Sequence, residues 1–340
     1  MKKLLLLISG IVLLLPLATF ADGSGALSIS TSPLPINLLA DPGTTATTQL
    51  RVKNNGTSLE RLKVTLLKFK AGDMSGQPAL ASQAPGDTYF DWVSFSPSVF
   101  DAPPGEWQTI TMSIKIPKSA AFDYDLAAVF SREAAVTPTP GSTAVAGSTA
   151  TLILLTVNSP NMKRQVSPIS FTADRSFYEF LPTSFSVHLR NTGNVHVAPM
   201  GNIFITNGNS QVDTIQVNQT GGNILPGSDR IYTAQWTDGF PVYVPKQLNG
   251  AAVVKNGKPE TTLKWDFTQV PKLRFGHYTA HLTMVYSDGI RDIPITAEVS
   301  FWVIPWRIIF IPIPIIILIV GLFLRNRQLK HRVKRLEHKR

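Results

Sequence analysis

The sequence contains no cysteine among its 340 residues. This absence excludes disulfide bonds, thiolate–zinc sites, iron–sulfur clusters and cysteine nucleophiles. Charged residues are also few, at 16% of the chain, and no long central stretch shows helical periodicity. Hydrophobic residues make up 44%, and the length is sufficient for two domains. Such domains must rest on apolar burial and strand pairing alone.

The central region carries no excess of positive charge, although the net charge of the whole chain is +10. Residues 22–306 hold 21 basic and 21 acidic side chains, and the excess flanks two apolar segments near the ends of the chain. Eight basic residues stand in 325–340 against one glutamate. Membrane topology explains this distribution better than nucleic-acid binding. We therefore expect no nucleic-acid partner.

The N-terminus has the three parts of a secretory signal peptide. Two lysines precede the apolar run Leu4–Leu15, and a small-x-small ending stands before Asp22. The apolar run is shorter than a comfortable membrane span, which favours cleavage after Ala21 over an uncleaved anchor. The sequence thus predicts a signal peptide over residues 1–21.

A second apolar segment, Ile308–Leu324, carries no charge and is rich in isoleucine and leucine. It is long enough to span a bilayer, and Trp302 and Trp306 stand where interfacial indoles belong. The basic tail 325–340 follows at once and indicates that the C-terminus stays in the cytoplasm. We predict a single-pass protein of the cell membrane with a large extracellular N-terminal region.

The region between the two apolar segments consists of short alternating stretches separated by Gly, Pro, Asn and Asp clusters. This pattern predicts an all-β protein with two tandem Ig-like β-sandwich domains, over residues 26–158 and 165–304. An additional segment, 239–275, reads as a loop-rich insertion with one hairpin in the second domain. The expected strands are Leu50–Lys53, Leu62–Leu66, Thr109–Ile116, Leu126–Ser131, Thr149–Val157, Phe185–Leu189, Asn202–Thr206, Ile231–Trp236, His277–Tyr286 and Ile293–Val303.

The two halves resemble each other at three places in the same order. The strand-and-turn segment 50–56 corresponds to 187–193, and the turn at Pro104 and Gly105 corresponds to the Pro-Gly pair at 226–227. The third correspondence joins residues 122–124 to 276–278. Each signal alone is weak, but their common order favours duplication of one module.

The order of these parts resembles a known family. Ala40-Asp41-Pro42-Gly43 and Val52-Lys53-Asn54-Asn55-Gly56, the second module, the membrane helix and the basic tail together resemble the WxL-interacting surface proteins of Gram-positive bacteria. The resemblance implies a peptidoglycan-binding first module and a second module that contacts a host or partner protein. The chain departs from the family at 122–126, where a glycine-rich run is usual.

Residues that carry chemistry form no recognisable site. His277 and His281 share one strand face without a third ligand, which favours solvent-facing strand positions over a metal site. Asp123 and Asp125 stand before a strand without calcium-loop spacing, and we interpret them as a solvated turn. We predict a non-enzymatic protein with no catalytic residue, cofactor, metal or small-molecule substrate.

Aromatic residues are the remaining candidates for contact with a partner. Trp92 and Trp236 are expected in the cores, whereas others suit stacking on sugars or anchoring of a protein. The candidate partner-binding residues are Tyr89, Trp107, Phe240, Tyr243 and Trp265.

Two functions stay open. The first is a surface protein that displays its modules to cell-wall glycan or to a surface protein. The second is a membrane-tethered chaperone or assembly factor for surface or secreted proteins, which pairs a sandwich edge with a client strand. Glycan binding requires exposed aromatics in a groove, and client binding requires an uncovered apolar edge.

Overall fold

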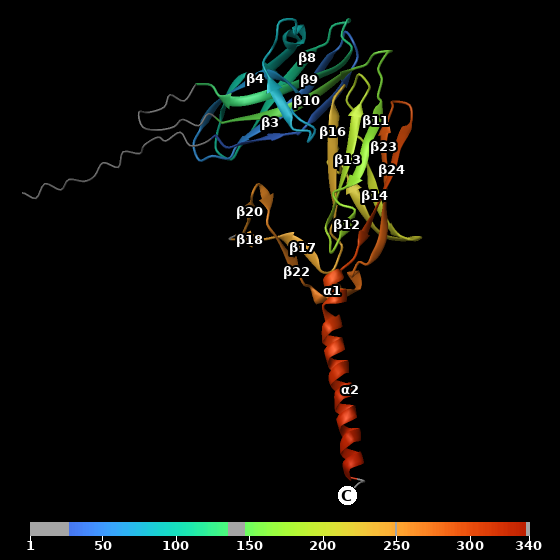
Figure 1. Cartoon of the computed structure of the whole chain (residues 1–340). Helices are drawn as coiled ribbons and strands as arrows, with labels where there is room; N and C mark the ends of the chain where they lie inside the picture. Colours follow the sequence, from blue (N-terminus) through green and yellow to red (C-terminus); the bar gives the residue numbers. More distant parts are fainter. Residues whose placement is uncertain (1–26, 135–146, 249, 338–340) are drawn as a thin grey trace, which may run out of the picture.

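The computed structural model describes residues 27–134, 147–248 and 250–337. It confirms the all-β prediction: two β-sandwiches are followed by a C-terminal helix (Figure 1). The expected signal peptide, residues 1–21, lies outside the described residues.

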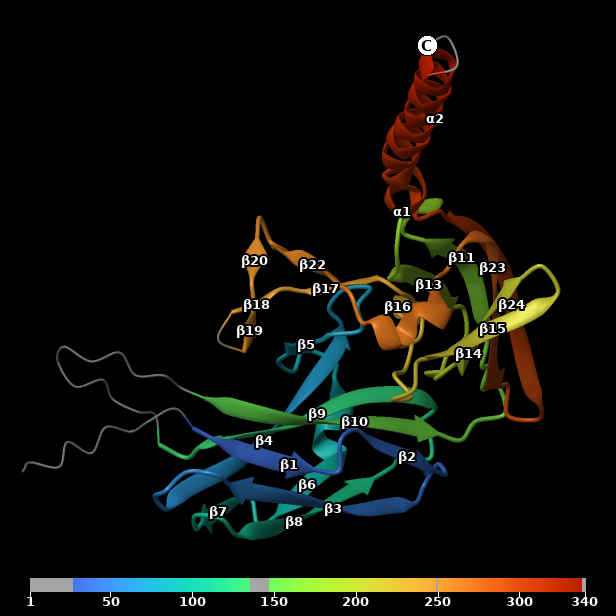
Figure 2. The ribbon, with the colours of Figure 1, turned by 90° about the horizontal axis from the view of Figure 1, so that it is seen from below.

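The first domain packs two sheets against each other. One has the order β1 (Ile29–Ser32), β3 (Thr45–Asn54), β8 (Trp107–Lys115), β6 (Val93–Ser96). The other has the order β2 (Ile36–Ala40), β10 (Ser148–Val157), β9 (Phe122–Arg132), β4 (Glu60–Ala71), β5 (Pro78–Ala81), with β7 (Val99–Ala102) also on β4. A 3₁₀ helix, η1, covers Thr88–Trp92. Figure 2 shows the β9–β10 sheet as the layer nearer to the second domain.

Alternation along the strands decides which side chains enter the first core. Leu50 and Val52 of β3 are buried and face Leu126 and Phe130 of β9 across the sandwich. The intervening residues of β3 are polar and exposed, as an ordinary outer face requires.

The second domain has the same two-layer architecture. One sheet has the order β11 (Val166–Ala173), β13 (Thr183–Asn191), β16 (Asp229–Trp236). The other has the order β12 (Phe177–Tyr178), β24 (Asp292–Val303), β23 (Gly276–Ser287), β14 (Met200–Asn207), β15 (Ser210–Val217). Trp236 is fully buried between the layers, with its ring 5.1 Å from that of Tyr278 and 6.0 Å from that of Phe301.

The segment 239–275 contains more strand pairing than the one expected hairpin. Its main pair is β17 (Val242–Pro245) with β22 (Thr261–Lys264), and η2 (Phe267–Lys272) follows. Two shorter pairs extend it: β18 (Gln247–Leu248) with β19 (Ala251–Ala252), and β20 (Val254–Lys255) with β21 (Lys258–Pro259).

The proposed duplication is visible as the same hydrogen bonds in both domains. The buried Asn54 amide donates to Ser58 O and Ala102 O, and its Oδ1 accepts from Gly56 N–H. Asn191 repeats this arrangement with Val195 O, Ile224 O and Gly193 N–H. Each asparagine therefore closes its own strand-to-turn corner.

The second correspondence also has matching geometry. The N–H of Gly105 donates to Asn54 O, and the N–H of Gly227 donates to Asn191 O, at 2.8 and 3.1 Å. Both glycines have positive φ, 76° and 71°, a conformation in which glycine alone is unstrained. The two Pro-Gly turns thus dock on equivalent asparagines.

The chain leaves the second domain through helices α1 (Trp306–Phe310) and α2 (Pro312–Glu337). Within the described part of the chain, Trp306–Gln328 is the one helical segment long and apolar enough to cross a membrane. Pro312 occupies the first position of α2, where its missing N–H leaves no hydrogen bond broken.

Candidate functional site

The outer face of the β2–β10–β9–β4–β5 sheet is apolar, unlike that of the opposite sheet. Phe69, Ala127, Val129 and Leu154 form a buried cluster there, outside the sandwich core. Leu225 of the second domain packs on this cluster. The face is therefore directed at the neighbouring domain and needs apolar cover.

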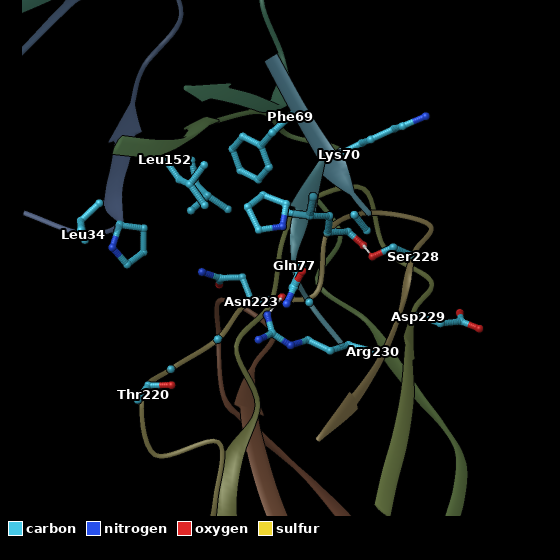
Figure 3. A pocket seen from close by; sticks show the side chains of 18 residues that line it. Leu34, Phe69, Lys70, Gln77, Leu152, Thr220, Asn223, Ser228, Asp229 and Arg230 are labelled. Atoms are coloured by element: carbon cyan, nitrogen blue, oxygen red, sulfur yellow. Dashed lines mark hydrogen bonds between the residues drawn. The ribbon is translucent and has the colours of Figure 1, made fainter. Parts of the chain in front are cut away.

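A cleft of about 350 Å³ lies beside this cluster, between the two domains (Figure 3). Its first-domain wall is mainly apolar, with Leu34, Phe69 and Leu152, whereas Arg230 and Asn223 face it from the second domain. The other lining residues are Pro35, Lys70, Ala71, Gly76, Gln77, Pro78, Leu154, Thr220, Gly221, Gly222, Leu225, Ser228 and Asp229. The cleft thus combines a mainly apolar first-domain wall with the cationic side chains of Lys70 and Arg230.

Arg230 is fixed in this wall by contacts from both domains. Its Nη1 donates to Asn223 O at 2.7 Å, and its guanidinium lies 5.1 Å from the centre of the Tyr232 ring. A Cβ at Gly76 would stand 2.2 Å from Cζ of Arg230, so the guanidinium lies directly against the backbone of the first domain at this glycine. The adjacent N–H of Ile231 donates to Met74 O at 2.7 Å. The β4–β5 hairpin therefore docks on β16.

A strand edge opens next to the cleft. β10 pairs with β9 along its whole length, but β2 covers its other edge only from Ile153 to Val157. No described strand pairs with that edge from Ser148 to Leu152. Leu27 lies against Gly147 at the start of this half-edge. Strand edges without a ladder partner are places where an extended segment can add to a sheet.

The interpretation of Asp123 and Asp125 as a solvated turn is wrong. Both lie in β9, and the Asp123 side chain is only 3% exposed. Asp123 accepts from Thr156 Oγ1 at 2.7 Å and from the backbone N–H of His196, whose Nδ1 lies 2.8 Å from Asp123 Oδ2. These contacts fasten β9 to the second domain, because His196 belongs to that domain.

Asp125 faces the same interface without such partners. Its Oδ1 is buried and has no hydrogen-bond partner among the described residues. Burial, together with a smaller effect of the nearby Asp123 carboxylate, raises the pKa of Asp125 to about 7, while His196 acts in the opposite direction. An unpaired buried carboxyl of this kind makes the interface sensitive to pH.

The predicted aromatic residues do not meet at one site. Tyr89 packs against Tyr124 and Trp92 at the edge of the first core, and Trp107 is exposed beneath the guanidinium of Arg51. The Trp107 ring lies 4.9 Å from Cζ of Arg51.

The other three aromatics gather in the insertion. Phe240 is buried against Trp265, and both Trp265 and Tyr243 approach the Phe180 ring, at 6.4 and 6.1 Å. Phe240, Tyr243 and Trp265 thus form one cluster, whereas none of the five candidates lines the interdomain cleft. Their role in partner binding stays a prediction.

His277 and His281 lie on the outer face of β23, as predicted. His281 Nδ1 lies 2.9 Å from Glu298 Oε1, and His277 is exposed beside Trp302. Among the described residues, no group of three His, Asp or Glu side chains is arranged to hold a metal ion.

The cleft residues were missed because no motif marks them. A signal is nevertheless present: β9 and β10 carry unbroken apolar runs at 126–130 and 152–155 instead of alternation. Such runs are typical of strands covered on both faces. They indicate that this sheet has a second apolar face, although they do not reveal what covers it.

No family model and no curated protein matches the chain. Among solved structures, the chain is similar to several pilus chaperones. The class 5 fimbriae chaperone CfaA is 13% identical over 79% of this chain and 98% of its own, with a TM-score of 0.38. CsuC in its pre-assembly complex with the tip subunit CsuE, from Acinetobacter baumannii, is 10% identical over 79% and 97%, with a TM-score of 0.36.

The E. coli chaperone DraB is 10% identical over 81% of this chain and 100% of its own, with a TM-score of 0.32. Identities and TM-scores this low do not indicate a shared partner. The resemblance to WxL-interacting proteins has no support from a family model.

Proposed function

We propose that the chain is a non-enzymatic, membrane-anchored assembly factor whose interdomain cleft holds an apolar, extended segment of an exported protein. The observation that carries this proposal is the apolar outer face of the β10–β9–β4 sheet, which continues into the cleft and ends at the unpaired half-edge of β10. An extended client segment gains main-chain hydrogen bonds at such an edge and apolar burial beside it.

The opposite sheet provides an internal comparison. At equivalent outward positions of β3, the residues are Thr47, Gln49 and Arg51, all exposed and polar. The outward-facing residues of β10, on the cleft side, are Ala150, Leu152 and Leu154. The apolar character is thus confined to the face that borders the cleft.

The first alternative, display for glycan binding, has less support. Sugar binding relies on aromatic platforms with several polar groups, yet Phe69 is the one aromatic side chain that lines the cleft. Trp107 is exposed but stands outside any described groove. Peptidoglycan binding of the kind implied by the WxL-interacting resemblance therefore rests on short sequence motifs alone.

The anchor is part of the proposal. Segment Trp306–Gln328 has the length and composition of a membrane span, and the basic tail favours a cytoplasmic C-terminus. An assembly factor held in this way keeps its cleft on the outer side, close to where exported chains emerge.

Site-specific photocrosslinking in living cells tests the cleft. A photoreactive residue at Leu152 is expected to form adducts with an exported polypeptide, and one at Gln49 is expected to form none. Leu152→Glu should then reduce the surface level of the crosslinked protein, whereas Gln49→Glu should not. Equal adducts at both positions, or an unchanged surface level in Leu152→Glu, would contradict the proposal.

A further inference from the structure

An exposed apolar patch lies at the end of the second domain from which the helix departs. Its members are five residues in and around η2, which we name the collar: Trp265, Phe267, Val270, Leu273 and Phe275. Their exposed fractions run from 40% for Leu273 to 72% for Phe267. So many large apolar groups within eleven consecutive positions require a partner surface.

The collar is held rigidly against the start of the helix. Arg307 of α1 pairs with Glu179, at 3.3 Å, and the next residue, Phe180, lies 6.4 Å from the Trp265 ring. The N–H of Phe240 donates to Lys272 O at 3.0 Å, which fixes the end of η2. The collar is thus attached to the second domain close to the helix exit.

Asp238 completes this attachment. Its two carboxylate oxygens lie 2.5 Å from Lys272 Nζ and from Arg274 Nη2. Arg274 also donates from Nε to Asp238 O at 2.8 Å. The segment that carries the collar is thus tied to the end of β16 at two of its side chains.

The connection to the helix is too short to separate the domain from a membrane. Only Ile304 and Pro305 stand between the end of β24 and the start of α1. Figure 1 shows β17 and β22 beside α1, at the same end of the second domain. A bilayer entered by Trp306–Gln328 would meet this end of the domain directly.

The composition around the collar suits the boundary between headgroups and acyl chains. Trp306 and Trp302 are each close to half exposed at the helix exit. Lys264 is exposed directly before the first collar residue, and the stem of such a lysine can extend along apolar surface while its charge reaches a phosphate. Aromatic rings beside basic groups are typical of interfacial segments.

We infer that the collar is a lipid-contacting surface, embedded in the outer leaflet boundary around the base of the anchor helix. This inference rests on the membrane anchor of the proposed function, but not on the client cleft. The collar and helix together hold the second domain upright by two contacts with the bilayer instead of one. The insertion thus serves to orient the domains above the membrane.

The absence of cysteine makes a direct test available, because one introduced cysteine gives one label position. Full-length protein carrying Phe267→Cys, labelled with an environment-sensitive fluorophore, is reconstituted into phosphatidylcholine–phosphatidylglycerol vesicles. The matched control is Ile290→Cys, which is 96% exposed in the turn between β23 and β24, at the end of these strands remote from the helix. Both labelled proteins insert into the vesicles with the same mixture of orientations. The ratio of quenching at the two positions therefore does not depend on that mixture.

We expect blue-shifted emission at position 267 and quenching by spin-labelled lipids, with iodide quenching several-fold weaker than at position 290. Anchored protein with equal iodide quenching at both positions would overturn the collar and leave the anchor standing. Release of the protein from vesicles by alkaline carbonate would overturn the anchor and the collar together. Neither result bears on crosslinking at the cleft, so the two proposals fail separately.

Discussion

Replacing Asp125 by asparagine removes a carboxyl group while keeping the shape of the side chain. Burial raises the pKa of Asp125 to about 7, so the folded state favours the protonated form. In the unfolded chain the carboxyl ionises near its ordinary pKa of about 3.9. The contribution of Asp125 to the free energy of unfolding is therefore fully present below about pH 4 and is lost as the pH rises to about 7.

The size of this loss follows from the same pKa difference. Three pH units correspond to about 4 kcal/mol. This is an upper bound, because the residue as a whole is only partly buried although its Oδ1 atom is covered. We expect a loss of about 2 to 4 kcal/mol between pH 4 and pH 8 in the wild type, and little of it in Asp125→Asn.

Urea unfolding of residues 22–304, followed by circular dichroism at several pH values, measures this difference. The control is Asp91→Asn, because Asp91 is exposed in the same domain. Subtracting the variant curve from the wild-type curve cancels groups that both proteins share. If Asp125→Asn keeps the pH dependence of the wild type, Asp125 is not buried as described and the interface is not pH-sensitive through it.

Three further outcomes are expected. Asn54→Ala and Asn191→Ala should each lower the free energy of unfolding by about 3 kcal/mol, because each leaves two backbone carbonyls and one N–H without their partner; unchanged urea midpoints would contradict this. Deleting Gly250–Pro259 should cost less than about 1 kcal/mol, since this tip is mostly exposed, and a large drop in thermal midpoint would show unsuspected packing. A reporter after Arg340 should be active in the cytoplasm and one after Val157 outside; an external C-terminus would refute the anchor topology.

Much of the fold follows from local sequence patterns. Each expected strand falls within a strand of the structure or differs from one by a residue or two, because period-two alternation directly reports which side chains enter the core. The repeated Asn-Gly corners were also recognisable, since Asn54 and Asn191 precede matching turns. Their buried hydrogen bonds explain why the same short motif stands in both domains.

The cleft and its interface could not be predicted in the same way. Asp123 contacts His196, 73 positions later, and Arg230 lies against Gly76 of the other domain. Such contacts depend on how the two sandwiches dock. The docking does not produce a periodic sequence pattern in either domain. The collar is partly predictable from the sequence, because Trp265 is a candidate aromatic of the insertion. The position of the collar beside the helix exit depends on the folded domain.

The two walls of the cleft become available at different times as the chain emerges N-terminus first. Every strand of the first sandwich finds its partners within residues 29–157, so this domain has all it needs to fold before the second is synthesised. Its apolar outer face then stays open until Leu225 and Arg230 arrive with β16. The second domain of the same chain is thus the first occupant of that face. Under the proposed function, a client would bind only beside the part that Leu225 covers.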